Sequence, residues 1–347
     1  MLSEKPWIAA LVAALAIACG GAEAPPETSE SEAAAESPDT GAGSILRVDP
    51  RLDALVPADA RIEKLADGFV FTEGPVWIGA ESRLLFSDVR DNAIHQWSEA
   101  AGASPFIQPV FEGDPEGLAL AGSNGLTLDA EGRLVICEHG NRRISRVEAD
   151  GSRTVVVDRY EGDRLNSPND LVYGADGSLY FTDPPYGLEG QEESPLRELD
   201  FNGIFRLRPD GDLEVLVRDQ SRPNGIALSP DETTLYVANS DQDPKVWMAY
   251  DLDESGASNA RVFYDVTDQT APGAPDGMKV DTAGNIFATG PGGVWVFTPD
   301  GEHLGTIMPD ERPANVGWGD DGRTLYMTAQ TGLYRIALTT GGVLPGP

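Results

Sequence analysis

The stretch SPNDLVYGADGSLYFTDPPYG, residues 167–187, decides the fold of this chain. It holds two short runs rich in β-branched and aromatic residues, 171–173 and 179–182, on either side of Asp176-Gly177. Asp-Gly between two such runs is a strong hairpin signal, because the turn needs positive φ angles that glycine adopts at little cost. The stretch therefore predicts two adjacent antiparallel strands, with the polar residue Asn169 at the start of the first.

Five other stretches repeat this layout along the chain. Aligned on the second strand, the apolar markers are Leu84, Leu134, Leu179, Leu235, Ile286 and Leu325, at spacings of 50, 45, 56, 51 and 39 residues. A repeat of roughly 40–50 residues built from short strands is typical of a β-propeller with one blade per repeat. The six copies predict an all-β fold with six blades.

Each copy begins with a polar residue that lies 10 or 11 residues before its marker. These residues are Glu73, Asn124, Asn169, Asn224, Asp276 and Asn315. The first strand of a propeller blade lines the central channel, so we expect the six side chains to converge on one axis. Any one of them alone is better explained as a turn cap or a wetted channel residue. Together they form a ring of hard oxygen donors that suits Ca²⁺, Mg²⁺ or Mn²⁺, and a dication would relieve the repulsion between the two carboxylates.

The ends of the repeat array predict how the ring closes. The last repeat ends after GLYRIAL, residues 332–338, and lacks a fourth strand. Residues 61–66 look like a lone strand that precedes the first repeat. We expect this strand to complete the last blade, which would leave no free sheet edge there.

The N-terminal segment predicts export. Residues 1–19 contain Lys5, an apolar run too short to span a bilayer, and LAIAC ending at Cys19. LAIAC resembles the cleavage box of a bacterial lipoprotein signal, which predicts a lipid anchor on Cys19, with an ordinary secretory signal as the alternative. Gly20 then favours the periplasmic side of an outer membrane. Residues 20–44 have the composition of a disordered acidic linker, so the folded domain is expected over 45–347.

Charge and cysteine content exclude two classes of protein. The net charge of −32 argues against nucleic acid as a partner, because binding it needs a basic face. The chain has two cysteines, Cys19 and Cys137, and Cys19 belongs to the signal. A disulfide scaffold is therefore not expected.

Several stretches of the chain carry a resemblance to a known family. They include FTEGPVW, CEHGNRR, RLNSPNDL, YFTDPPYG, RPNGIALSPDE and GAPDGMKVD, and they run from Phe71 to Phe297 with weaker matches as far as Arg335. The sequence resembles the senescence-marker-protein / gluconolactonase / luciferin-regenerating-enzyme family, and within it the bacterial gluconolactonase branch. The resemblance implies a six-bladed propeller with one divalent cation in the channel.

The resemblance also implies roles for individual residues. The metal ligands would be Glu73, Asn224 and Asp276, with Asn169 touching metal or substrate. Asp276 would be the proton acceptor and donor. Some relatives have an arginine where this chain has Ser167, so Arg142, Arg164 or Arg222 would have to contact the substrate instead. We also count Asn124 and His139 among the expected substrate contacts, although His139 is equally well explained as a hydrogen-bonded loop residue.

These observations predict a metal-dependent hydrolase that opens small sugar lactones. The cation, Ca²⁺ in the first place and otherwise Zn²⁺, Mg²⁺ or Mn²⁺, would polarise the lactone carbonyl. Asp276 would act as general base and then general acid. Two alternatives stay open: hydrolysis of organophosphates or aryl esters at the same site, and a non-catalytic propeller that binds a cation or a sugar.

Overall fold

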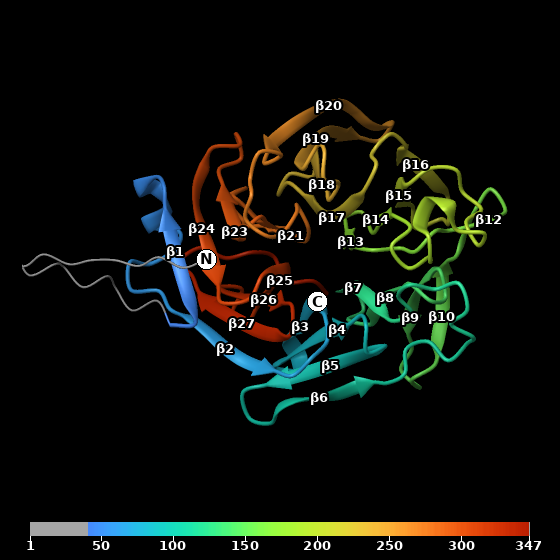
Figure 1. The fold of residues 1–347 in the computed structure, drawn as a ribbon, viewed down its shortest axis with the longest axis horizontal. Coiled ribbons are helices and arrows are strands. Elements are labelled where there is room, and N and C mark those ends of the chain that lie inside the picture. The colour runs from blue at the N-terminus through green and yellow to red at the C-terminus, as the bar shows by residue number, and fades with distance from the viewer. Residues whose placement is uncertain (1–40, 347) are drawn as a thin grey trace, which may run out of the picture. The chain divides into compact units, whose positions relative to one another are not determined.

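Six antiparallel sheets surround a central axis in the computed structural model, which describes residues 41–346 (Figure 1). The predicted six-bladed β-propeller is confirmed. The predicted signal segment 1–19 and the linker up to residue 40 lie outside the described residues. Within residues 41–346, no helix has the length and apolar character needed to cross a membrane.

Blades 1 to 5 each contain four consecutive strands and blade 6 contains three, and in every blade the first strand lies nearest the axis. Blade 1 contains β3 (Thr72–Ile78), β4 (Arg83–Asp88), β5 (Ala93–Ser98) and β6 (Gly102–Ile107), and blade 2 contains β7 (Ser123–Leu128), β8 (Leu134–Glu138), β9 (Arg143–Val147) and β10 (Arg153–Val157). Blade 3 contains β13 (Leu171–Tyr173), β14 (Leu179–Asp183), β15 (Gly203–Leu207) and β16 (Leu213–Val217), and blade 4 contains β17 (Pro223–Leu228), β18 (Thr234–Asn239), β19 (Val246–Asp253) and β20 (Gly256–Asp265). Blade 5 contains β21 (Met278–Val280), β22 (Ile286–Gly290), β23 (Gly293–Phe297) and β24 (His303–Pro309), and blade 6 contains β25 (Pro313–Gly319), β26 (Thr324–Ala329) and β27 (Gly332–Ala337).

The ring closes through a strand from the other end of the chain. Strand β2 (Ile62–Asp67) pairs antiparallel with β27 and becomes the fourth strand of blade 6, with Ile62 opposite Ile336. This confirms the closure predicted for residues 61–66. The structure adds a feature that the sequence did not indicate: β1 (Gly43–Arg47) pairs with β24 and gives blade 5 a fifth strand. The N-terminal segment thus joins two neighbouring blades.

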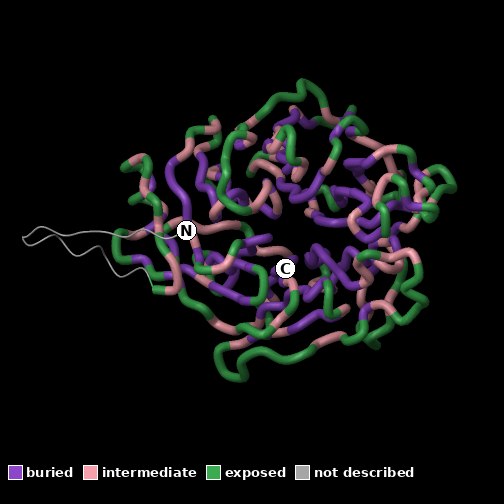
Figure 2. The backbone as a smooth tube through the Cα atoms, viewed as in Figure 1, coloured by how far each residue is buried: buried purple, intermediate pink, exposed green. Residues whose placement is uncertain are grey.

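The hydrophobic core lies between the blades, where sheet faces pack against each other (Figure 2). Aromatic side chains fill much of this space. Trp77 of blade 1 stacks on Tyr326 of blade 6 with ring centroids 5.6 Å apart, and Phe287 of blade 5 meets Trp318 of blade 6 at 5.1 Å. Such pairs add geometric preference to the burial of apolar area, and they fix the angle between adjacent blades.

Deleting residues 45–66 tests the closure. The deletion removes three of the five residues of β1 and nearly all of β2, so it exposes the edge of β27 and the buried face that Ile62 covers. We expect loss of a cooperative thermal transition in calorimetry. Glu63→Gln, on the exposed side of the same strand, is the control and should keep the wild-type transition because the Glu63–Arg335 ion pair is largely exposed. A deletion variant with an unchanged melting temperature would contradict the role given to β2.

Candidate functional site

Around the channel, the inner strands of neighbouring blades pass so close to each other that their backbones are in contact. A Cβ atom added to Gly225 would lie 2.3 Å from the carbonyl oxygen of Asp276, and one added to Gly125 would lie 2.7 Å from that of Asn169. Only glycine fits at such distances. Each of these glycines directly follows a residue of the predicted ring, so the N-G pattern of the repeats is explained by the close approach of the next blade.

Hydroxyl groups on the second strands hold the inner strands of the next blade in place. Ser87 Oγ donates to the carbonyl oxygen of Asn124 at 2.7 Å, and Thr182 Oγ1 donates to that of Asn224 at 2.7 Å. In four of the six blades the register also shifts next to the ring residue; in β3 the shift falls between Glu73 and Val76. Bulges of this kind redirect side chains, and here they accompany the residues that face the axis.

The structure buries five residues of the predicted ring and leaves Asp276 partly accessible. Glu73 and Asp276 influence each other electrostatically, and both respond to a third carboxylate, Asp170, which was not predicted. The amide nitrogen of Asn315 contacts Asp170 Oδ2 at 3.5 Å, and the same side chain opposes the rise in the pKa of Glu73. The channel therefore gathers three carboxylates where the sequence indicated two.

Asp170 directly follows Asn169 in SPND. Aligning the six repeats selected one polar position in each blade. Asp170 was left out because the other blades have no polar residue at the following position. The signal was nevertheless present, because blade 3 alone has two consecutive residues with side-chain oxygens at this point, whereas four of the other blades have glycine there.

The electrostatics of the channel disfavour three separate negative charges. Burial, and after it the charge of Asp170, raises the pKa of Glu73 to about 7. Burial followed by the charges of Glu73 and Asp170 raises the pKa of Asp276 well above its ordinary value. Among residues 41–346, none of the three carboxylates forms an ion pair within 4 Å. A bound cation would supply the missing positive charge.

His139 is completely buried just after β8. Neither ring nitrogen has a hydrogen-bond partner in the described part of the chain, and burial lowers the pKa of the imidazole to about 4. Its Cβ lies next to Gly187, where an added methyl group would approach it to 3.0 Å. His139 is therefore a neutral buried imidazole with two unused polar atoms.

Arg142 differs from the free substrate contact that we expected. Its guanidinium donates to the carbonyl oxygens of Leu165 at 2.8 Å and Leu196 at 2.5 Å, and further contacts reach Asn166 and Glu198. The side chain fastens loops together, and its role in substrate binding stays a prediction. Ser167, the position where some relatives have arginine, is also structural: its Oγ donates to Pro184 O at 2.6 Å and accepts from Gly187 N at 2.8 Å.

A second group of potential metal ligands lies in blade 1. One ligand atom each from Asp88, Asp91 and His95 lies within 4.8 Å of the others. Asp88 already accepts the backbone N–H groups of Val70 and Phe71 at 2.8 and 2.9 Å. The Asp88 carboxylate thus accepts hydrogen bonds from the loop before β3, and these bonds explain why it can be buried without a cation.

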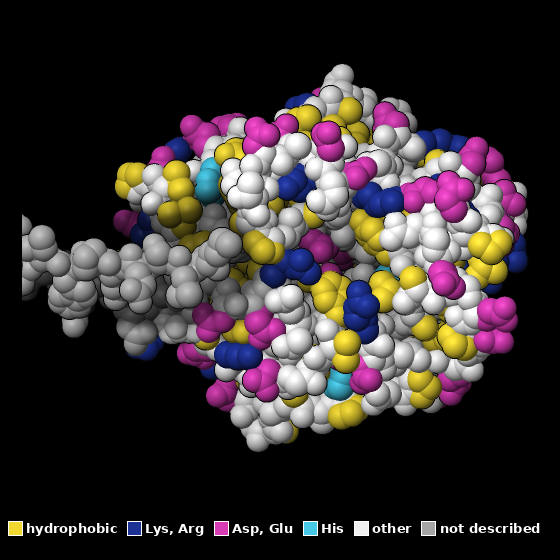
Figure 3. Space-filling view, viewed as in Figure 1, with side chains coloured by type: hydrophobic (Ala, Val, Ile, Leu, Met, Phe, Trp, Pro, Cys, Tyr) yellow, Lys and Arg dark blue, Asp and Glu magenta, His cyan; other side chains and the backbone are white. Residues whose placement is uncertain are grey.

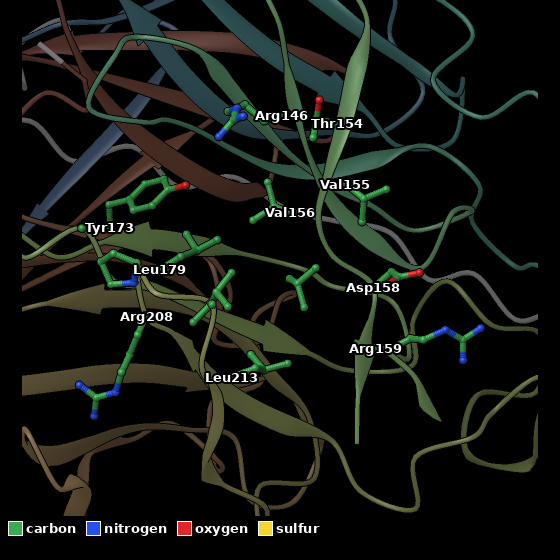
Figure 4. A pocket seen from close by; sticks show the side chains of 15 residues that line it. Arg146, Thr154, Val155, Val156, Asp158, Arg159, Tyr173, Leu179, Arg208 and Leu213 are labelled. Carbon is green, nitrogen blue, oxygen red and sulfur yellow. The ribbon is translucent and has the colours of Figure 1, made fainter. Parts of the chain in front are cut away.

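Two hollows differ in character. In the space-filling view, acidic side chains lie deep in the central opening and basic ones surround its rim (Figure 3). A hollow of about 650 Å³ near this opening is lined by Asp276, Arg312 and Lys245 among others. The other hollow, about 550 Å³, lies between blades 2 and 3, with Val156 and Leu179 at its centre and Arg208 directed outward (Figure 4). It contains no predicted site residue.

Comparison with known proteins agrees with this geometry. Residues 71–331 match the family model described as the SMP-30/Gluconolactonase/LRE-like region, which spans all six inner strands. The chain belongs to this family. Its similarity to the SMP-30/gluconolactonase/LRE-like proteins therefore covers the whole channel.

Individual members of the family extend the comparison. A gluconolactonase from Zymomonas mobilis is 42% identical over 312 residues, which cover 86% of this chain and 87% of that protein. A pentonolactonase from Haloferax volcanii is 31% identical over 269 residues, covering 75% of this chain and 81% of that protein. The solved structure of a gluconolactonase from Xanthomonas campestris matches with a TM-score of 0.76 and 33% identity, covering 86% of this chain and 96% of that one.

Buried His139 should make stability depend on pH. In the unfolded chain the imidazole binds a proton below about pH 6.5, whereas the folded protein resists protonation until about pH 4. The free energy of unfolding should therefore fall as the pH drops through this window, by up to about 3 kcal/mol from this residue. Denaturant titrations of the wild type and His139→Gln should diverge between pH 7 and pH 4. Curves that stay parallel would show that the imidazole is not held neutral.

Proposed function

We propose that this protein is a metal-dependent hydrolase that opens small sugar lactones. The observation that carries the proposal is the proximity of Glu73, Asp170 and Asp276 at the channel, where neighbouring carboxylates disfavour ionisation of Glu73 and Asp276 and none of the three has an ion pair among residues 41–346. Relatives that match 86% and 75% of this chain are named gluconolactonase and pentonolactonase, respectively. The proposed substrate is accordingly a lactone of a five- or six-carbon aldonic acid.

The donor atoms of the channel fit a divalent cation. Glu73 and Asp276 offer carboxylate oxygens, and Asn224 offers its Oδ1, because its Nδ2 is already bonded to Ser240 Oγ at 2.8 Å. Asn169 completes the predicted set. Asn315 is better placed as a brace, since its Oδ1 accepts from Val316 N at 2.8 Å and its Nδ2 contacts Asp170.

The chemistry of these donors ranks the candidate metals. Carboxylate and amide oxygens, with neither sulfur nor imidazole nitrogen in the proposed set, favour Ca²⁺. Mg²⁺ and Mn²⁺ accept the same ligands, and Zn²⁺ would be the least expected. Asn124 Oδ1 is buried and has no partner among residues 41–346, so it remains available to the substrate or to a water.

The residues of the channel divide the reaction between them. When bound, a dication would act as a Lewis acid that polarises the lactone carbonyl. Asp276 takes a proton from the attacking water as the new C–O bond forms at the carbonyl carbon. It returns that proton to the ring oxygen when the ring C–O bond breaks, which yields the open hydroxy acid. Asn124 and His139 orient the sugar hydroxyl groups through buried polar atoms that have no partner among residues 41–346, and Asn169 contacts the substrate from the proposed metal set.

Substitutions at the two carboxylates separate binding from chemistry. Asp276→Asn should lower kcat by about 10²–10⁴ through loss of the general base. Glu73→Gln should weaken metal affinity by at least about tenfold and reduce activity with it. Titration of metal into each variant, followed by calorimetry, measures the change in metal affinity independently of turnover. Asp91→Asn, in the second carboxylate group of blade 1, is the matched control and should leave both properties unchanged.

Metal analysis and a substrate panel test the function itself. Purified protein should contain about one equivalent of Ca²⁺ or a related dication per chain. Glucono-1,5-lactone and a pentono-lactone should release acid, and EDTA should abolish the release. Full activity after complete chelation would exclude the metal mechanism. Faster turnover of a phenyl ester or a phosphofluoridate would favour the ester or organophosphate alternative, and cation binding without any turnover would favour the non-catalytic propeller.

A further inference from the structure

Residues 184–202, between β14 and β15, form a segment that departs from the blade repeat and is fastened on two sides. Toward blade 2, Ala119 N donates to Gly187 O at 2.9 Å and Glu189 N donates to Gly117 O at 2.9 Å. Toward blade 4, Arg222 Nη2 donates to Glu192 Oε2 at 2.8 Å, and Asn202 Nδ2 donates to Ser221 O at 2.7 Å. The segment therefore bridges blades 2 and 4 and has little freedom to shift.

Tyr186 is carried by this fastened segment between Pro185 and Gly187. Its hydroxyl oxygen is buried and has no hydrogen-bond partner among residues 41–346. Ser240 and Asn224 lie near enough to that oxygen to interact with it, although not at hydrogen-bond geometry, and the charges of Asp276 and Arg222 also act on it. The hydroxyl of Ser240 is already engaged, because it donates to Pro275 O and accepts from Asn224 Nδ2.

A buried hydroxyl group without a hydrogen bond lowers the stability of the protein unless a ligand supplies the missing partner. The location of this one limits what the ligand is. It lies beside the carboxylate that handles the proton in the proposed reaction and beside an amide proposed to hold the cation. A substrate atom placed there would be one of the two oxygens of the scissile ester.

We propose that Tyr186 is a catalytic hydrogen-bond donor to the ring oxygen of the lactone, the atom that leaves as an alkoxide. The inference rests on the proposed lactonase function. The carbonyl oxygen would face the cation, so the ring oxygen is the one that needs a protein donor. Tyr186 transfers no proton: Asp276 delivers the proton that came from water, and the phenol stabilises the charge that develops while the ring C–O bond breaks. A donor held in place by a fastened segment needs no rearrangement during the reaction, and this is the condition under which such bonds accelerate a step.

Tyr186→Phe in the full-length protein tests the inference, because it removes one oxygen and keeps the ring. With glucono-1,5-lactone we expect kcat to fall by about 10²-fold, with KM within about twofold of the wild type. Metal content and melting temperature should be unchanged, since the lost hydroxyl has no protein partner. Tyr173→Phe, which removes a hydroxyl at the outer hollow, is the matched control and should leave kcat unaltered.

A change of leaving group distinguishes this role from a structural one. Phenolate is a far weaker base than a sugar alkoxide and needs little help, so turnover of a phenyl ester by Tyr186→Phe should fall by less than about threefold. An equal loss on both substrates, an unchanged kcat, or a rise in KM alone would overturn the inference. If the wild type opens no lactone, the proposed function fails and the role of Tyr186 fails with it. An active wild type with a fully active Tyr186→Phe variant overturns the role of Tyr186 alone.

Discussion

Backbone contact between neighbouring inner strands is the constraint on which the rest of this structure depends. Where Gly225 passes Asp276 and Gly125 passes Asn169, there is no space for a side chain, so the strands meet with their peptide groups. The residue just before each of these glycines, Asn224 and Asn124, belongs to the predicted ring. The same contact that sets the radius of the ring thus concentrates polar side chains at its centre.

This concentration opposes stability. Burial and the neighbouring carboxylates disfavour the ionised forms of Glu73 and Asp276, and the charges of Lys279 and Arg312 oppose this effect only in part, which is unfavourable for folding in the absence of a cation. Packing between blades offsets it. Trp77 on Tyr326 and Phe287 on Trp318 lie outside the channel and fix the blades irrespective of what the channel holds. The scaffold can therefore hold an electrostatically unfavourable centre, as functional sites commonly require.

The repeat made the architecture predictable, and the same property limited what else could be predicted. Six copies at regular spacing gave the blades, the channel residues and the strand that closes blade 6. Features that occur once have no second copy to compare with. Asp170, the fifth strand of blade 5 and the segment that carries Tyr186 were missed or left unspecified for this reason. For Arg142, composition shows that an arginine is present, whereas only coordinates show that its guanidinium already donates to carbonyl oxygens. Its role as a substrate contact stays a prediction.

The pairing of β2 with β27 also determines when the fold can be completed. Glu63 and Arg335 are 272 positions apart, yet they face each other in one sheet. During synthesis, β2 leaves the ribosome long before β27 has been made, so until then β2 has no strand to pair with. Blades 1 to 4 can form in the order of their translation, whereas the circle stays open until β27 has been translated. A ribosome that stalls within the final repeat would release a chain with an exposed sheet edge, which is a natural substrate for chaperones and proteases.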